Sequence, residues 1–143
     1  MSRLFILALL TACTTTPDSG GGEDSDPAGV ECGAPETFDV EITAKVIAGK
    51  DPAEGIEVAL DDRGYTGDIL GSGMTGADGK VTFTAVGVTS LAGCWGIVLN
   101  YWLVATDPAD ESRKAEDDMN TELYNAIDGG SLATDVSDRP LEL

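Results

Sequence analysis

The sequence predicts a mainly β fold: a single β-sandwich of the seven-stranded type over residues 32–143, with one helix near its C-terminal end. Three observations lead to this expectation. Apolar and polar residues alternate through most of the segment, turns rich in Gly and Asp separate the alternating runs, and the apolar period lengthens to four only in the last quarter. A segment of this size is long enough to close one hydrophobic core, so one domain is expected.

The first two strands are predicted from strict alternation. Apolar side chains occupy every second position in residues 38–46, which indicates a strand with one buried face and one solvated face. Residues 49–52 form a turn, and the alternation resumes in residues 56–60. The inward positions of all strands make up the predicted core: Phe38, Val40, Ile42, Ile56, Val58, Leu60, Val81, Phe83, Ile97 and Leu99.

The next two strands are separated by a turn signal. A weaker strand is predicted near residues 69–75, where Gly71 and Gly73 indicate an edge strand or a bulge. Asp78-Gly79 predicts a hairpin turn, because glycine supplies a positive φ without strain, and residues 81–85 form the return strand.

The longest apolar run covers residues 94–105, interrupted by Asn100, and predicts a central strand buried on both faces. Twelve residues are too few to span a membrane. Trp95 and Trp102 are an odd number of positions apart, so they point to opposite faces of one continuous strand and one of them reaches the surface. A surface tryptophan serves either as rim packing or as a ligand platform.

The last quarter predicts an amphipathic helix, because apolar residues recur every four positions in residues 115–127. The helix begins at Asp107-Pro108, or Asn120 caps a shorter version of it. It ends at Asp128-Gly129-Gly130 in either case. A short strand in residues 139–143 then closes a sheet edge.

Two segments of the predicted sheets resemble a known signature. Ala53-Glu54-Gly55-Ile56-Glu57-Val58-Ala59-Leu60 and Thr75-Gly76-Ala77-Asp78-Gly79-Lys80-Val81-Thr82-Phe83 are similar to the strand and turn pattern of carboxypeptidase-regulatory-like, transthyretin-type β-sandwich domains. The resemblance covers about residues 38–105 and implies that fold. It implies little about function, because one fold carries many activities. Gly93-Cys94-Trp95 and a longer apolar run stand where those relatives have a short strand.

The N-terminus is predicted to be an address and an anchor. Residues 4–9 are apolar and precede Leu10-Thr11-Ala12-Cys13, which resembles the lipobox of bacterial lipoproteins. The resemblance implies a signal peptide in residues 1–12, a lipid thioether on Cys13 and lasting membrane attachment through its acyl chains. An ordinary secretory signal fits less well, because the small-residue cleavage site is poor. Thr14, in place of the aspartate that marks inner-membrane retention, favours the outer membrane by the same resemblance.

Residues 13–31 are predicted to be a disordered, acidic tether that follows the lipidated cysteine. They are rich in Thr, Ser, Gly, Pro and Asp and contain almost no apolar side chains, so they cannot bury enough surface to offset chain entropy. A chain of this composition has an rms reach of roughly 20 to 25 Å. The domain would therefore stand off the membrane.

The net charge of the chain is −18, and removal of the signal peptide with Arg3 leaves 7 basic against 26 acidic residues, or −19. Such a surface repels nucleic acid and anionic lipid headgroups, so neither is an expected partner. The expected partners are the membrane through the lipid anchor and an envelope protein or polysaccharide. The charge has three further interpretations, namely cationic partners, divalent ions and a saline habitat that demands an acidic surface, and the last of these is favoured.

Three cysteines allow a simple assignment. Lipidation uses Cys13 and leaves Cys32 and Cys94 as an even pair in an oxidising compartment, which predicts a disulfide bond between them. Two buried free thiols are the alternative. A metal site built from two cysteines without histidine is a weaker one.

The chain contains no histidine, which excludes Ser-His-Asp and Cys-His catalysis and histidine-ligated metals. The activities of transthyretin-like hydroxyisourate hydrolases and intradiol dioxygenases depend on histidines and do not carry over. Phosphate-loop, dinucleotide and nucleophile-elbow motifs are also absent. The acids, such as Asp39, Glu41, Glu57 and the run Glu116-Asp117-Asp118, are predicted to face water. No catalytic residue, cofactor or metal ligand is therefore predicted.

The function predicted from these observations is that of a lipid-anchored, non-catalytic envelope lipoprotein whose β-sandwich is an interaction or structural module. A carbohydrate- or cation-binding module, which uses an exposed tryptophan or the acidic loops, is the first alternative. A hydrolase of unrecognised type, for example one with a pair of carboxylates, is the second.

Overall fold

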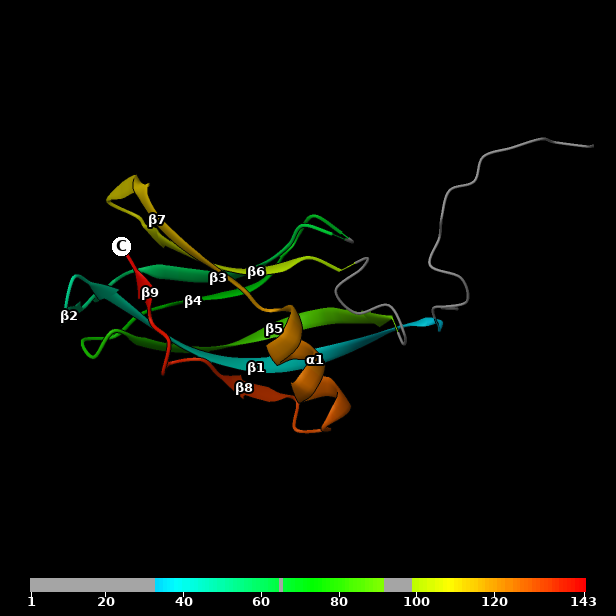
Figure 1. Cartoon of the computed structure of the whole chain (residues 1–143). Helices are drawn as coiled ribbons and strands as arrows, with labels where there is room; N and C mark the ends of the chain where they lie inside the picture. Colours follow the sequence, from blue (N-terminus) through cyan, green and yellow to red (C-terminus); the bar gives the residue numbers. More distant parts are fainter. Residues whose placement is uncertain (1–32, 65, 92–98) are drawn as a thin grey trace, which may run out of the picture.

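The computed structural model describes residues 33–64, 66–91 and 99–143, which contain nine strands and one helix (Figure 1). The elements are β1 Pro35–Ala48, β2 Asp51–Pro52, β3 Glu57–Asp62, β4 Ile69–Met74, β5 Lys80–Leu91, β6 Tyr101–Asp107, β7 Asp110–Asp118, α1 Asn120–Asp128, β8 Ala133–Asp135 and β9 Leu141–Glu142.

The strands form two sheets that lie in two layers (Figure 1). In the five-stranded sheet, β1 pairs antiparallel with β2 and β5 and parallel with β8 and β9. The four-stranded sheet is antiparallel, in the order β4-β3-β6-β7. The predicted mainly β fold with one helix is confirmed. The strand count is a correction, because the nine described strands exceed the seven predicted. β2 and β8 are too short to show a periodic pattern, and β7 lies in residues that were assigned to the helix.

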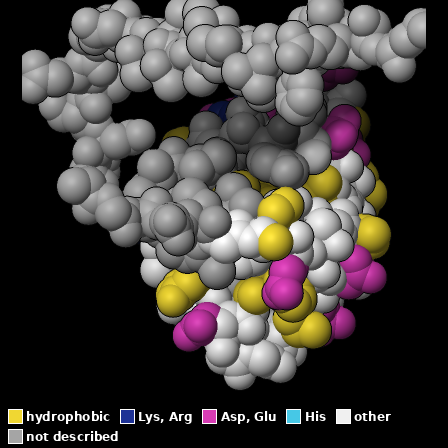
Figure 2. Space-filling view, turned by 90° about the vertical axis from the view of Figure 1, so that its right-hand side faces the viewer, with side chains coloured by type: hydrophobic (Ala, Val, Ile, Leu, Met, Phe, Trp, Pro, Cys, Tyr) yellow, Lys and Arg dark blue, Asp and Glu magenta, His cyan; other side chains and the backbone are white. Residues whose placement is uncertain are grey.

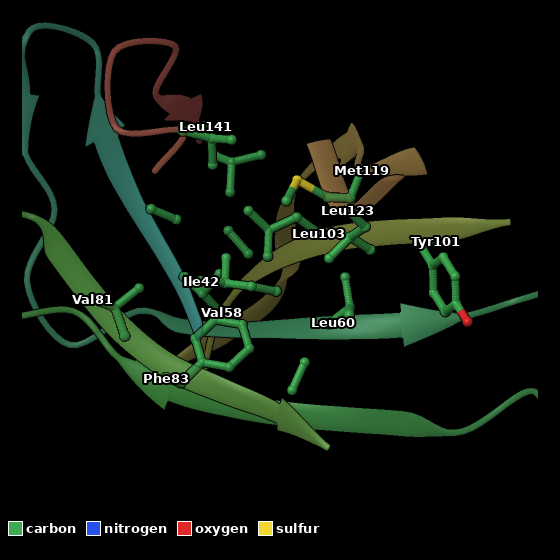
Figure 3. Packing of buried hydrophobic residues seen from close by; sticks show 14 of the residues in the cluster. Ile42, Val58, Leu60, Val81, Phe83, Tyr101, Leu103, Met119, Leu123 and Leu141 are labelled. Atoms are coloured by element: carbon green, nitrogen blue, oxygen red, sulfur yellow. The ribbon is translucent and has the colours of Figure 1, made fainter. Parts of the chain in front are cut away.

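One hydrophobic core joins the two sheets, α1 and the C-terminal strand (Figure 3). β1 buries every second residue, as the alternation predicts, and β3 does the same. Most of the predicted core positions that the structure describes are buried: Val40, Ile42, Ile56, Val58, Leu60, Val81, Phe83 and Leu99. Phe38 is partly buried against this core, and Ile97 lies outside the described residues.

β4 is an edge strand, as its glycines predict, and the register shifts between Leu60 and Asp61 of its partner β3. The glycines also allow a close approach between the sheets. A Cβ atom on Gly71 would lie 2.3 Å from the carbonyl oxygen of Thr84 in β5, and one on Gly73 would lie 2.7 Å from a methyl group of Val81. The two sheets therefore close against each other along β4 and β5.

Gly71→Ala is expected to lower the free energy of unfolding by about 1 to 3 kcal/mol, because the new Cβ meets backbone atoms that must move. The measurement is a urea unfolding curve with the slope held as a check on two-state behaviour. Ser72→Ala is the matched control at the neighbouring exposed position of β4, and it should change stability by less than about 0.5 kcal/mol. Equal stability of the two variants would refute the close contact.

The turn at Asp78-Gly79 forms, but the predicted hairpin is wrong. Gly79 has a φ of 72°, and the Asp78 carboxylate accepts a hydrogen bond from the Lys80 backbone N–H at 3.0 Å. The strands on either side belong to different sheets, since β4 pairs with β3 and β5 pairs with β1. The residues Asp78-Gly79 thus predict the position of the turn correctly. They do not predict which strands pair, because β4 and β5 belong to different sheets.

The central strand β6 begins at Tyr101 rather than at residue 94, and residues 92–98 lie outside the described part of the chain. It is buried on one face only: Tyr101, Leu103 and Ala105 are buried, and the alternate residues are partly exposed. The Tyr101 hydroxyl donates to the carbonyl oxygen of Thr89 at 3.0 Å and accepts from the Thr89 N–H at 2.8 Å. This pair of bonds ties β6 to β5 across the two sheets.

Of the two predicted helix starts, the one at Asp107-Pro108 is wrong and the shorter helix is present: a hairpin strand comes first, and the helix begins at Asn120. Asp107 accepts a hydrogen bond from the Ala109 N–H at 2.9 Å, and this Asx turn sends β7 back along β6. The run Glu116-Asp117-Asp118 therefore lies on a strand. Helix α1 covers Asn120–Asp128, with Met119 at the N-cap position, and the Asn120 side chain instead accepts the Tyr101 N–H. The predicted end of the helix is confirmed, and the final strand is present as β9.

Candidate interaction surface

The residues that carry the sequence-based site predictions are mostly beyond the described ranges. Cys13, Cys32, Cys94 and Trp95 all lie outside them. Trp102 is described, and it lies half-buried on the solvent side of β6. Among the described residues, no group of three or more Asp, Glu, Cys or His side chains is arranged to hold a metal ion.

We define the outer face as the solvent-facing side of the four-stranded sheet. β3 buries Val58 and Leu60, so its alternate positions point outward, and the cross-strand register extends this orientation to the neighbouring strands. The outer face comprises Ile69, Ser72 and Met74 of β4, Glu57, Ala59 and Asp61 of β3, Trp102, Val104 and Thr106 of β6, and Lys114, Glu116 and Asp118 of β7. Ala59 and Val104 lie opposite each other in its middle row.

Arg63 links three strands of the outer face. Its guanidinium donates two hydrogen bonds to the Glu116 carboxylate, at 3.0 and 2.7 Å, and one from Nε to Asp61 at 2.7 Å. The guanidinium carbon also lies 5.3 Å from the ring centroid of Trp102, within the range of a cation–π contact. The bidentate geometry orients Arg63 more firmly than a single ion pair would.

The backbone holds Arg63 in place at the end of β3. Asp62 is fully buried and accepts hydrogen bonds from the backbone N–H groups of Gly64 and Thr66, which fixes the turn after the strand. The Arg63 N–H donates to the carbonyl oxygen of Asn100, and the Asn100 side chain accepts the indole N–H of Trp102. Hydrogen bonds therefore fix both the backbone of Arg63 and the indole of Trp102, the two groups that form the cation–π contact.

This arrangement favours the charged forms of Arg63 and Glu116. The hydrogen bonds from Arg63 lower the pKa of Glu116 below its ordinary value, and the same contacts with Glu116 and Asp61 raise the pKa of Arg63. A carboxylate whose pKa is lowered is a poor proton donor at neutral pH. The cluster is suited to electrostatic recognition rather than to general acid chemistry.

A shallow hollow of about 290 Å³ lies on the outer face. Ala59, Val104 and Ile69 provide its apolar surface, and charged side chains surround it. The residues that line the hollow are Glu57, Ala59, Asp61, Arg63, Ile69, Val104, Thr106, Lys114 and Glu116.

A second hollow, of about 340 Å³, lies between β7 and β9. Arg139 crosses its margin and forms ion pairs with Asp117 at 3.3 Å and with Glu122 at 2.6 Å. These pairs connect β7, the segment before β9 and α1. This hollow is therefore engaged in packing between elements, and the outer face is the better candidate for an external ligand.

The pairing of Arg63 with Glu116 was not predicted from the sequence. Arg63 falls between the strands predicted at residues 56–60 and 69–75, and Glu116 falls within the predicted helix, so the sequence alone could not bring the two together. The usable signal was Asp107-Pro108-Ala109-Asp110, which contains the turn-forming residues of a hairpin. A hairpin at this position places β7 beside β6 and brings Glu116 to the outer face.

Glu116→Gln is expected to lower stability by less than about 1 kcal/mol at neutral pH, because the ion pair is partly exposed. The lowered pKa of Glu116 in the folded state means that its contribution is fully present above the ordinary pKa of about 4.3. The contribution is lost as the pH falls through the lower, folded value. The difference in free energy of unfolding between wild type and variant should therefore be constant above about pH 5 and vanish in acid.

The control for this measurement is Glu54→Gln, which removes the same charge from an exposed position in the turn before β3. A difference that equals that of Glu54→Gln at every pH, or that grows on acidification, would contradict the stabilising role of the Arg63–Glu116 pair.

Comparison with known proteins adds no relative. The chain matches no protein-family model, and no curated sequence or solved structure is significantly similar to it. Within the described ranges, no helix combines the length and the apolar character needed to cross a membrane.

Proposed function

We propose that this chain is a lipid-anchored, non-catalytic lipoprotein of the bacterial envelope, with a transthyretin-type β-sandwich that acts as an interaction or structural module. Cys13 carries the anchor after removal of residues 1–12, residues 13–31 form the tether, and residues 32–143 form the domain. The sequence Leu10-Thr11-Ala12-Cys13 behind an apolar run is the observation that carries the proposal. The residue after the cysteine favours the outer membrane.

The two layers of strands around one core support the sandwich part of the proposal. In such a domain the inner faces are filled by side chains, so a ligand has to bind outside the core. β1, β3 and β6 all bury their inward side chains, and both described hollows lie on the surface.

Two features of the outer face favour binding over catalysis. Its basic group Arg63 is engaged by Glu116 and Asp61, and the pKa of Glu116 is lowered rather than raised. A catalytic carboxylic acid needs the opposite shift, which burial without a cationic partner produces. The carbohydrate-binding alternative loses support at Trp102, because Arg63 covers one face of the indole that a sugar ring would stack on.

The experiment that tests the non-catalytic function is an activity screen of the mature chain, purified in neutral detergent, against esterase, glycosidase, peptidase and phosphatase substrates. We expect no turnover above the background, which is measured with an identically prepared sample of the destabilised variant Gly71→Ala. Turnover that disappears when a single Asp, Glu or Lys is replaced, while the chain stays folded, would overturn the proposal and establish an enzyme.

A further inference from the structure

We propose that the outer face docks an extended, cationic segment of a partner protein, with one aliphatic side chain in the hollow and basic side chains over its acidic rim. This inference deepens the interaction role proposed above and rests on it. It names the partner by its chemistry: a segment in which basic and aliphatic residues point to one side.

Exposed apolar side chains lie on the same face as the hollow. Ile69 and Met74 of β4 are exposed to 58% and 53%, and they are two of the five large hydrophobic side chains that the described structure leaves exposed. Both lie on the outer face: Ile69 lines the hollow together with the half-buried Ala59 and Val104, and Met74 lies opposite Glu57 at the other end of the β3–β4 pair. Exposed apolar groups that gather around a hollow with a charged rim are typical of a protein contact site.

The charged side chains of the outer face are mostly acidic. The outer face carries four acids, Glu57, Asp61, Glu116 and Asp118, against Lys114. Arg63, which directly follows β3, adds a second positive charge beside it. Arg63 is held by Asp61 and Glu116, and Glu57 forms no ion pair with any described residue. The net charge of the face is therefore negative, on a chain of net charge −18. Figure 2 views the molecule from the right-hand side of Figure 1, and acidic side chains are spread over the described surface that is visible there as well.

The outward side chains of β3 have a spacing that an extended segment can match. Along β3 the outward side chains are Glu57, Ala59 and Asp61, an acid, a small apolar residue and an acid at every second position. Same-face side chains of an extended segment repeat at about 6.5 to 7 Å, so a segment with a base, an aliphatic residue and a base at alternate positions matches this order. The Arg63 contacts hold β3, β6 and β7 in one arrangement, which reduces the ordering cost of binding.

The test is an amide chemical-shift titration of the mature chain in neutral detergent with three capped pentapeptides. Lys-Ser-Val-Ser-Lys carries the predicted pattern, Lys-Ser-Thr-Ser-Lys replaces only the aliphatic side chain by one of the same shape, and Glu-Ser-Val-Ser-Glu reverses the charge. We expect the first peptide to bind at least threefold more tightly than the second. The third should not bind, and the shifts should concentrate on the outward positions of β3 and β6.

Three variants locate the binding. Ile69→Lys adds a positive charge at an exposed position of the face and is expected to weaken binding of the first peptide at least fivefold. Lys114→Glu replaces a positive charge of the face by a negative one and should strengthen binding of the first peptide. Thr84→Lys, the matched control, adds the same charge at an exposed position of β5 in the other sheet, and it should change the affinity less than twofold.

Equal weakening by Ile69→Lys and Thr84→Lys, or equal affinity for the valine and threonine peptides, would show diffuse attraction to an acidic chain and overturn the inference. That outcome leaves the non-catalytic function intact if the activity screen is negative. Turnover in the screen defeats the proposed function whatever the peptides do, so the two failures can be told apart.

Discussion

If this chain is the proposed lipoprotein, Cys13→Ser is expected to abolish lipid attachment completely, because the diacylglyceryl thioether of such proteins is built on the cysteine sulfur. The unmodified precursor should keep residues 1–12, since cleavage of a lipobox follows lipidation. Its nine apolar or small residues at positions 4–12 fall well short of the roughly 20 that a membrane-spanning helix needs. The variant should therefore be extracted from membranes by washing, whereas the lipidated chain stays bound through its acyl chains.

Metabolic labelling with a tagged fatty acid, followed by membrane fractionation, measures both effects. Cys32→Ser is the matched control: it also removes one thiol, and it should retain the label and the membrane attachment. A Cys13→Ser chain that is processed normally, or a label that is lost in Cys32→Ser instead, would sink the lipoprotein assignment.

The strands with one buried face were predictable from the sequence because burial leaves a period of two. β1 alternates from Val40 to Val46 between buried and partly exposed positions, and β3 repeats this pattern. β7 was not predictable in the same way. It is an edge strand with charged side chains on nearly every residue, so neither face shows an apolar row. Charge on an edge strand also discourages pairing with another chain.

The predicted helix extends too far toward the N-terminus for a specific reason. Ala115 is partly buried on β7, and Met119 is buried at the start of α1, while Leu123 and Ile127 belong to the helix itself. Their spacing of four combines two elements into one apparent helical stripe. Periodicity carries no information on where one element ends and the next begins, and the local turn chemistry at Asp107 settles the boundary here.

The candidate surface was less predictable than the fold, because it depends on pairs that are distant in sequence. Arg63 and Glu116 are 53 residues apart and meet only when β3 pairs with β6 and β6 with β7. The placement of Trp102 on a solvent face follows from alternation, but its contact with Arg63 does not. A single sequence reports which side chains are charged, and the register decides which charges meet.

Reduction or removal of a Cys32–Cys94 disulfide is expected to cost roughly 4 kcal/mol in the chain-entropy treatment, the largest stability effect that we predict. Both cysteines lie outside the described residues, so the pairing stays a prediction, and the described strands give only the positions of their sequence neighbours. The β1–β5 ladder ends at Pro35 opposite Leu91, and in the sequence Cys32 precedes Pro35 by three residues while Cys94 follows Leu91 by three. The hydrogen bonds between Tyr101 and Thr89 hold this end of the ladder in place. In the sequence, each cysteine is therefore three residues away from one member of the Pro35–Leu91 pair.

Thermal unfolding of the single and double Cys→Ser variants decides between a disulfide and two free thiols. If the cysteines are bridged, Cys32→Ser, Cys94→Ser and the double variant should all lose the same roughly 10 to 20 °C in Tm, because each removes the same bond. Separate thiols would instead give small effects that add. Alkylation of the native, unreduced chain is the independent check: labelling of both thiols would refute the disulfide, and labelling of Cys94 only in the Cys32→Ser variant would establish it.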